Sequence, residues 1–352
     1  MTSIVDTVEE VTPDWMTEAL GQGTVTGIET EVMSTGQLGH VARATLTYAD
    51  EAPTAPRTLM VKLPRADEGS RQLGVILGVY EAEVRFYQQI APTVDVNVPQ
   101  LFWGDVEPQT GRFTLLIEDL SDVGEPGDMI AGGTVDQAAG ALDALVALQA
   151  PRWSDPSLAE LGWLADPARN QVMFAGVEPA LPVFLERFGD HLEAEDRALV
   201  ERIAPKANAW CTQMNAGPNV VVHGDFRMDN LFFPHDSGRP VTVFDWQAAR
   251  LGPPLVDACV YVGGCLSLEE RRANERDLLQ RYHEGLVAAG VDGFSFDAVW
   301  ESYRWCVFYG LMLSVSMSVG LEQTERGDAL FAGMVRAYAQ HARDLDSEDL
   351  LG

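Results

Sequence analysis

Three polar side chains near the middle of the chain have the types and spacing to carry chemistry on a phosphate. Asp225 and Asn230 lie five residues apart in the string H-G-D-F-R-M-D-N, residues 223–230, which has apolar, strand-like flanks. Asp245 stands fifteen residues after Asn230, at the end of the apolar run 241–244. A carboxylate and an amide oxygen are typical ligands of a hard cation such as Mg²⁺. This pattern therefore predicts a metal-assisted site.

Phosphoryl transfer to a hydroxyl group needs such residues. One carboxylate must receive and orient the attacking hydroxyl, and oxygen ligands must hold the metal that offsets the charge of the phosphates. Taken singly, Asp225 would be a turn former and Asn230 a cap. Their order, their spacing and the flanking strands together favour the phosphotransfer site.

Lys62 is a second candidate, far upstream. The chain has only two lysines, Lys62 and Lys206. Lys62 interrupts the apolar run Leu-Met-Val-Lys-Leu, which is typical of a strand, whereas Lys206 lies in a polar segment. A lone cation in an apolar strand is a candidate for a functional role, although a solubility charge at a strand edge would give the same pattern.

These strings resemble the aminoglycoside phosphotransferase and choline kinase superfamily, whose H-G-D-x-x-x-x-N and strand-D-W elements parallel H-R-D-x-x-x-x-N and D-F-G of protein kinases. The resemblance implies that Asp225 is the catalytic aspartate and that Asn230 and Asp245 hold Mg²⁺. It also implies that His223 supports the loop and that Asp257, in Gly-Pro-Pro-Leu-Val-Asp, braces it.

The N-terminal half carries the same resemblance, which extends from about residue 30 to about residue 320. It implies that Lys62 binds the α- and β-phosphates of ATP and pairs with Glu83, with Glu81 as the competing choice. It also implies that the backbone at Glu118 to Leu120 binds adenine. Further ATP-binding residues are implied in the loop that covers the phosphates, namely Ser34, Gly36 and Gly39. The strings E-x-x-F-Y and I-E-D-L are most similar to the ecdysteroid-kinase-like branch.

The predicted elements fit this order. We expect an α+β, bilobal, protein-kinase-like fold, with a β-rich N-terminal nucleotide-binding lobe over residues 1–120 and a mostly helical C-terminal lobe over 121–352. The N-terminal lobe should hold one main helix, from about Arg71 to Ile90, and the C-terminal lobe should begin with a long helix over 135–149.

Composition limits the partners. The formal net charge is −29, with 53 acidic and 24 basic residues, so we exclude nucleic acid and anionic membranes as main partners. The four cysteines have no C-x-x-C spacing, and the N-terminus lacks a signal pattern, so we expect a reducing cytoplasm. The apolar run 306–321 is too short to span a bilayer and should be a buried helix.

We therefore expect an ATP- and Mg²⁺-dependent phosphotransferase that acts on a small-molecule hydroxyl. The alternative from another class is a nucleotide-binding but inactive pseudokinase, which the filled chemical positions disfavour. A protein kinase is disfavoured because no A-P-E-like segment follows Asp245. The acceptor stays open between aminoglycoside, amino alcohol, sugar and sterol-like compounds, because the acidic composition and the resembled branch point in different directions. The oligomeric state also stays open.

Overall fold

The structure is a computed structural model of the whole chain and describes residues 2–35, 39–49, 54–214, 217–236, 238–319 and 324–351. The chain divides into two compact units, which are described separately. The first unit comprises Met1–Thr93, Val98–Glu125 and Phe244–Ala248; the second comprises Val94–Asn97, Pro126–Val243 and Ala249–Gly352. Whether these units correspond to the nucleotide-binding and acceptor-binding lobes expected from the sequence stays a prediction.

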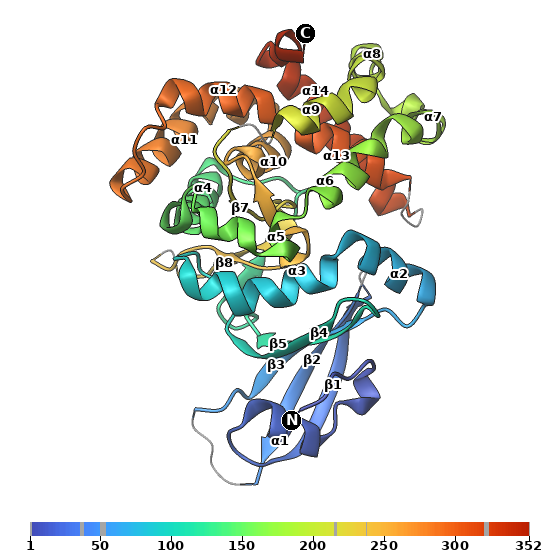
Figure 1. Cartoon of the computed structure of the whole chain (residues 1–352), viewed down its shortest axis with the longest axis vertical. Coiled ribbons are helices and arrows are strands. Elements are labelled where there is room, and N and C mark those ends of the chain that lie inside the picture. The colour runs from blue at the N-terminus through green and yellow to red at the C-terminus, as the bar shows by residue number, and fades with distance from the viewer. Residues whose placement is uncertain are drawn as a thin grey trace. The chain divides into compact units, whose positions relative to one another are not determined.

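The first unit is built on a five-stranded antiparallel sheet, seen as the group of arrows β1 to β5 in Figure 1. Its strand order is β1-β2-β3-β5-β4. The strands are β1 (Val25–Thr35), β2 (Gly39–Tyr48), β3 (Thr58–Pro64), β4 (Leu101–Glu107) and β5 (Arg112–Glu118).

Side chains alternate between the two faces of the sheet along β3, so the two faces have different surroundings. Leu59, Val61 and Leu63 enter an apolar cluster with Met16 of α1 (Pro13–Leu20). Side chains of successive strand residues point to opposite faces, so Lys62 lies on the other face. Thr12 caps α1, because its hydroxyl accepts a hydrogen bond from the Trp15 N–H at 3.3 Å.

The helix expected over residues 71–90 is present but divided into α2 (Glu68–Leu77), α3 (Val79–Arg85) and a π-helical turn, Phe86–Ile90. Gly78 separates the first two helices because its φ of 64° lies in the left-handed region, where it ends α2 and precedes α3. Figure 1 shows α3 in cyan, and α3 packs against β4 and β5 of the sheet and against the turn Trp246–Ala248.

The second unit is mainly helical, as expected. A capping box at Thr134 and Gln137 starts α4 over the residues predicted for the long helix. The helices are α4 (Val135–Gln149), α5 (Gly162–Ala165), α6 (Pro167–Ala175), α7 (Val177–Phe188), α8 (Ala194–Ile203), α9 (Ala207–Met214), α10 (Val256–Cys265), α11 (Leu268–Ala288), α12 (Phe296–Cys306), α13 (Phe308–Ser318) and α14 (Glu325–Asp344).

Short strands carry the loop of the H-G-D string. β7 (Val220–Val222) pairs with β10 (Arg250–Gly252), and β8 (Leu231–Pro234) pairs with β9 (Thr242–Val243). A further strand, β6, covers Gly124–Pro126. β7 is fully buried and leads into the H-G-D string.

Within the apolar run 306–321, α13 (Phe308–Ser318) forms the core helix that the sequence predicts. Most of α13 is buried, including Phe308, Leu311 and Val315. Over the part of the chain that the structure describes, no helix is long and apolar enough to cross a bilayer.

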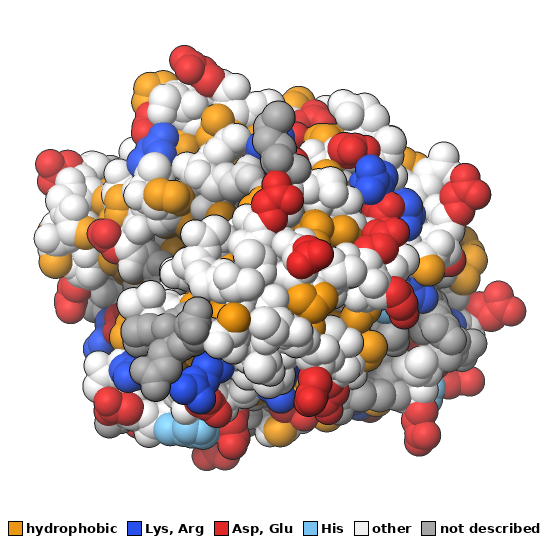
Figure 2. All heavy atoms as spheres, turned by 90° about the horizontal axis from the view of Figure 1, so that it is seen from below, with side chains coloured by type: hydrophobic (Ala, Val, Ile, Leu, Met, Phe, Trp, Pro, Cys, Tyr) orange, Lys and Arg blue, Asp and Glu red, His pale blue; other side chains and the backbone are white. Residues whose placement is uncertain are grey.

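The acidic composition appears on the surface as scattered charge. Figure 2 shows one face of the molecule, where acidic side chains stand among uncharged, basic and hydrophobic ones and do not form one continuous patch. This distribution agrees with a general role of the charge in solubility.

Candidate active site

The first unit contains a buried group of charges, called here the Lys62 cluster, that consists of Lys62, Glu83 and Asp245. The Lys62 ammonium contacts Glu83 Oε1 and lies 3.1 Å from Asp245 Oδ1. Lys62 is 8% exposed and Glu83 is fully buried. Asp245 comes from 183 residues away in the sequence, so the fold brings together groups that no local element could. Glu81 instead lies 4.0 Å from Arg85, which makes Glu83 the partner of Lys62.

The protonation of the Lys62 cluster follows from its charges. Burial lowers the pKa of Lys62, but Asp245 and Glu83 offset this effect and raise it above its ordinary value. Burial raises the pKa of Glu83, Lys62 lowers it and Asp245 raises it, with a net increase. One ammonium faces two carboxylates, so full ionisation leaves one surplus negative charge. The cluster therefore favours an additional cation or proton.

The segment that carries Asp245 is fixed to α3 and to the π-helical turn after it. Trp246 stacks on Phe86 with ring centroids 3.6 Å apart and planes 7° apart. Gln247 Nε2 donates to Glu83 Oε2 at 3.4 Å. Asp245 has a φ of 64°, a conformation that costs on the order of 1–3 kcal/mol for a residue other than glycine. The stack and the hydrogen bond hold Asp245 in this strained conformation beside Lys62.

The second unit contains the loop of residues 223–230, called here the Asp225 loop. Asp257, on α10, accepts the backbone N–H groups of His223 at 2.7 Å and Gly224 at 2.9 Å. Asp257 is fully buried, and burial raises the pKa of its carboxyl, although His223 and the two N–H donors act in the opposite direction. Gly224 has a φ of 84°, which suits glycine and turns the chain after β7.

The same loop is held from the other side by Tyr309 of α13, whose hydroxyl donates to the Gly224 carbonyl at 2.7 Å. Burial raises the pKa of Tyr309 to about 12, so this hydroxyl keeps its proton at neutral pH. The guanidinium of Arg250 lies 5.0 Å from the centre of the Tyr309 ring. The two bonds of Asp257 and the bond of Tyr309 thus fix both backbone polar groups of Gly224.

Asp225 and Asn230 meet within the loop. Asn230 Nδ2 donates to the Asp225 carbonyl at 2.8 Å and to Asp225 Oδ2 at 2.9 Å, and Arg227 Nε lies 3.2 Å from the same carboxylate oxygen. The Asp225 side chain is 36% exposed, so its carboxylate is accessible. The buried His223 ring accepts the Asp225 N–H at Nδ1, 3.3 Å away.

The residues implied for the nucleotide lie at strand ends of the first unit. Glu118 ends β5, where its N–H donates to the Gln100 carbonyl at 2.9 Å, and the Leu120 carbonyl accepts from the Val123 N–H at 2.9 Å. Gly39 begins β2, where an added Cβ would lie only 3.2 Å from the Leu63 carbonyl oxygen. Gly36 and the side chain of Ser34 lie outside the described residues, so the phosphate loop expected there stays a prediction.

Some residues of this site are not apparent from the sequence. Tyr309 reads as one more aromatic residue of an apolar helix, 85 residues from Gly224, and no motif connects the two. Gln247 follows the D-W pair, but only the fold places its amide at Glu83. Arg227 could have been identified from the sequence as a residue of the site, because it lies inside the H-G-D string.

The donor atoms suit a hard cation such as Mg²⁺. Both Nδ2 contacts of Asn230 are made to Asp225, so its amide oxygen is the atom suited to a metal. Asp245 supplies a carboxylate, 34% exposed, from a cluster with surplus negative charge. Among the described residues, no group of three or more His, Cys, Asp or Glu could hold a metal on its own.

Three solved structures similar to this chain are small-molecule phosphotransferases and kinases. Macrolide 2′-phosphotransferase MphH from Brachybacterium faecium is 17% identical with a TM-score of 0.51, covering 91% of this chain and 95% of its own. A microcompartment-associated aminopropanol kinase is 14% identical with a TM-score of 0.54, covering 96% and 98%. The gentamicin complex of APH(2″)-IIa is 15% identical with a TM-score of 0.52, covering 95% and 97%. These likenesses confirm the α+β, protein-kinase-like fold.

The family comparison covers most of the chain. Residues 46–305 match the phosphotransferase enzyme family, APH, which confirms the superfamily resemblance. The likeness to the ecdysteroid-kinase-like branch stays a prediction. None of the curated proteins matches the chain. The chain therefore belongs to the phosphotransferase enzyme family, and it is an enzyme that transfers a phosphoryl group.

Proposed function

We propose that the protein transfers the γ-phosphoryl group of ATP to a hydroxyl group of a small molecule, with Mg²⁺. The observation that carries the proposal is the Lys62 cluster, in which a buried lysine meets two carboxylates, one of them on a strained backbone. Such an arrangement is costly for stability and is typical of a functional site. Related structures support the nucleotide, since one phosphotransferase of similar fold is ADP-bound, with 14% identity and a TM-score of 0.50.

In this proposal the first unit serves the nucleotide. Lys62, oriented by Glu83, binds the α- and β-phosphates, and the backbone at Glu118 to Leu120 binds adenine. Ser34, Gly36 and Gly39 belong to the loop over the phosphates. Asp245 and Asn230 hold Mg²⁺, which when bound neutralises charge on the phosphates.

The second unit serves the acceptor. The Asp225 carboxylate accepts a hydrogen bond from the acceptor hydroxyl and orients its oxygen toward the γ-phosphorus. A bond forms between that oxygen and phosphorus, the bond from phosphorus to the β–γ bridging oxygen breaks, and ADP leaves. The hydroxyl proton passes to Asp225 and then to solvent. Asp225 acts more by orientation than by full deprotonation, since the transition state is loose.

His223 and Asp257 support this role without touching the acceptor. Asp257 accepts two backbone N–H groups of the loop, and His223 accepts the N–H of Asp225. These bonds support a fixed direction for the Asp225 carboxylate. We also propose a cytoplasmic location, which is supported by four buried, free cysteines.

The test is an ADP-release assay with ATP and Mg²⁺ across aminoglycosides, amino alcohols, sugars and hydroxysteroids. We expect at least one acceptor to raise ADP release, and Asp225→Asn to lower turnover by about 10² to 10⁴ while ATP affinity changes little. Near wild-type turnover in Asp225→Asn would contradict the role of Asp225. Bound ATP without release of ADP for any acceptor would instead favour an inactive pseudokinase.

A further inference from the structure

Arg250 is a buried cation of the second unit that the proposed chemistry has not used. It lies on β10, between Asp245 and Asp257 in the sequence, and is 5% exposed. An arginine keeps its positive charge in a protein, so its burial costs free energy unless other groups compensate it. Because a buried charge is weak evidence for a gain in stability, the surroundings of Arg250 must show what it does.

The backbone of Arg250 adjoins the start of the Asp225 loop. β10 pairs antiparallel with β7, and Arg250 is the partner of Val222, the last residue of β7. His223, the first residue of the loop, follows directly. The pairing fixes where the side chain of Arg250 begins, one residue from the loop that carries Asp225.

The side chain of Arg250 contacts one support of this loop, Tyr309. The guanidinium carbon lies 5.0 Å from the centre of the Tyr309 ring, within the range of cation–π attraction. The ring is fully buried, and its hydroxyl donates to the Gly224 carbonyl at 2.7 Å. Burial raises the pKa of Tyr309 to about 12, and the charge of Arg250 acts in the opposite direction. The guanidinium therefore holds the ring and makes its hydroxyl a better donor.

The charge of Arg250 also acts on the other support, Asp257. This carboxylate is fully buried and accepts the N–H groups of His223 and Gly224 at 2.7 and 2.9 Å. Burial raises the pKa of Asp257, whereas His223, the two N–H donors and Arg250 lower it. Since the ionised carboxylate is the better acceptor, the charge of Arg250 favours the form of Asp257 that holds the loop.

We propose that Arg250 is a positioning residue for phosphoryl transfer, which fixes Tyr309 and Asp257 and, through them, the Asp225 loop. This inference rests on the proposed function of Asp225. Tyr309 and Asp257 hold the two backbone polar groups of Gly224, the carbonyl and the N–H, and Arg250 acts on both holders. Without Arg250, the Asp225 carboxylate keeps its chemistry but loses its fixed direction toward the acceptor hydroxyl.

The first experiment measures steady-state kinetics with an acceptor that the ADP-release assay identifies. Arg250→Met should lower kcat about 10- to 100-fold and change KM for ATP less than about 2-fold, because the direction of Asp225 matters in the transfer step. Arg250→Lys keeps the charge but not the planar guanidinium, so it should lower kcat less, by about 3- to 10-fold. Wild-type kcat in Arg250→Met would overturn the proposal, as would losses that lie in KM for ATP.

A double substitution tests whether Arg250 acts through Tyr309. Tyr309→Phe removes the hydroxyl that bonds to Gly224. Adding Arg250→Met to Tyr309→Phe should lower kcat by a smaller factor than adding it to the wild type, because one of the two routes to the loop is already lost. Equal factors in the two backgrounds would overturn the route through Tyr309.

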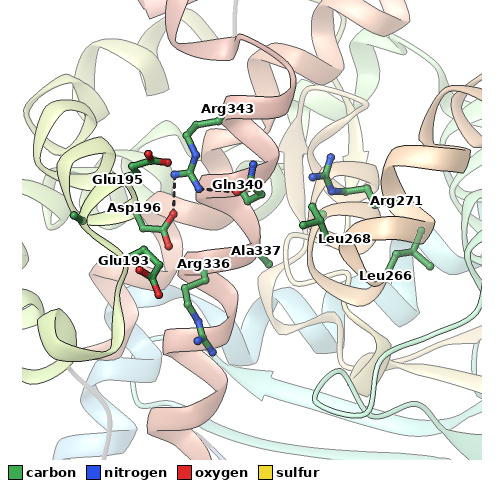
Figure 3. A pocket seen from close by; sticks show the side chains of 12 residues that line it. Glu193, Glu195, Asp196, Leu266, Leu268, Arg271, Arg336, Ala337, Gln340 and Arg343 are labelled. Carbon is green, nitrogen blue, oxygen red and sulfur yellow. Dashed lines mark hydrogen bonds and ion pairs between the residues drawn. The ribbon is translucent and has the colours of Figure 1, made fainter.

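Arg271 supplies the matched control, since it is a second buried arginine of the same unit. It is 2% exposed, lies 3.2 Å from Glu275 and contacts Asp344. Figure 3 shows its side chain at a cavity of about 670 Å³ that residues of α8, α10, α11 and α14 line. Within the described ranges of the chain, no residue of the Asp225 loop lines this cavity. Arg271→Met should therefore lose stability as Arg250→Met does but keep the wild-type kcat, and an equal loss of kcat would overturn the specific role of Arg250.

Hydrogen exchange tests the position of the loop without an acceptor. In Arg250→Met, the amides of residues 221–231 should exchange about 10-fold faster than in the wild type, relative to those of α7, because the bonds to Asp257 and Tyr309 open more often. Arg271→Met should keep the wild-type ratio. If the wild type releases no ADP with any acceptor, the kinase function fails. If it does, and the exchange ratio and kcat of Arg250→Met equal those of the wild type, only the role of Arg250 fails.

Discussion

The Lys62 cluster and the Asp225 loop solve the same problem, the precise placement of charge, in different ways. The Lys62 cluster joins residues 21 and 183 positions apart, buries Lys62 and Glu83, and pairs their charges with each other and with Asp245. The Asp225 loop is local in sequence and is held by neutral backbone groups bonded to Asp257 and Tyr309. Its reactive carboxylate stays partly exposed.

This difference determines what each residue contributes. In the Lys62 cluster, the groups assigned to catalysis also hold one another in place, so removing one leaves an uncompensated buried charge. In the Asp225 loop, the supporting bonds are separate from the reactive side chain. Asp225 can therefore be neutralised with little change in stability, while its supports can be removed without touching the carboxylate.

The largest effect should come from Lys62→Met. Methionine keeps most of the apolar stem but leaves Glu83 and Asp245 without their cation, so we expect a loss of about 3–5 kcal/mol in the free energy of unfolding. Turnover should fall by about 10² to 10³, because a charge assigned to the phosphates is removed. Urea unfolding and ADP release would measure the two effects, with Asp225→Asn expected to lose less than about 1 kcal/mol.

Lys206→Met is the matched control, since Lys206 is the other lysine of the chain and ends a short, partly exposed helical turn. Its free energy of unfolding should change by less than about 0.5 kcal/mol and its turnover should stay unchanged. If Lys62→Met were as stable as the wild type, the cluster would not be held by its charges, and the contrast with the Asp225 loop would disappear.

A smaller effect should come from Tyr309→Phe, which removes only the hydroxyl that bonds to the Gly224 carbonyl. We expect a loss of about 1 kcal/mol in stability, the usual value for one buried hydrogen bond. We also expect kcat to fall about 3- to 10-fold with KM for ATP unchanged, because the Asp225 loop would be less well positioned. Steady-state kinetics and thermal unfolding measure both quantities.

Tyr338→Phe supplies the comparison for this prediction. The Tyr338 hydroxyl is also buried and also donates to a carbonyl, that of Val260 on α10, at 3.1 Å. Tyr338→Phe should lose a similar amount of stability but keep the wild-type kcat, since the Tyr338 hydroxyl does not bond to the Asp225 loop. Equal changes in kcat for the two variants would mean that Tyr309 acts through general stability and not through the loop.

The sequence predicts the residues of both regions better than it predicts their supports. Lys62, Asp225, Asn230 and Asp245 stand out because their types, order and flanking strands occur together in one chain. The choice between Glu81 and Glu83 needs the structure, because residues two apart on a helix face different directions and only burial decides which faces Lys62. Here Glu83 is fully buried.

The features that the sequence does not predict have physical reasons as well. The sequence predicts one helix across Gly78, because an isolated glycine is tolerated within a helical pattern, whereas in the structure Gly78 is left-handed and ends α2. Gly74 has no Cβ where the Tyr80 ring lies, and an added Cβ would come within 2.6 Å of the Tyr80 hydroxyl. The bond of Tyr309 to Gly224 joins α13 to a loop 85 residues earlier in the chain, which no local pattern encodes.

The smallest predicted effect concerns the pH dependence of the Lys62 cluster. Burial raises the pKa of Glu83 above its ordinary value of 4.5, and the surplus negative charge of Asp245 acts in the same direction. Between 4.5 and the raised pKa, the folded state binds more protons than the unfolded state. The stabilisation that the protonated Glu83 carboxyl gives the folded state is therefore complete below pH 4.5. It is lost as the pH rises through the pKa that Glu83 has in the folded state.

Glu83→Gln should remove this dependence. Without ATP and Mg²⁺, the melting temperature of the wild type should fall more between pH 5 and 7.5 than that of Glu83→Gln, by on the order of a few degrees. Glu81→Gln, on the same helix but paired with Arg85 at the surface, should keep the wild-type profile. If Glu83→Gln kept it too, Glu83 would be ionised throughout this range, and no proton would relieve the surplus negative charge of the Lys62 cluster. That surplus charge would then be left for a cation, which would support magnesium at Asp245 but contradict the predicted protonation of Glu83.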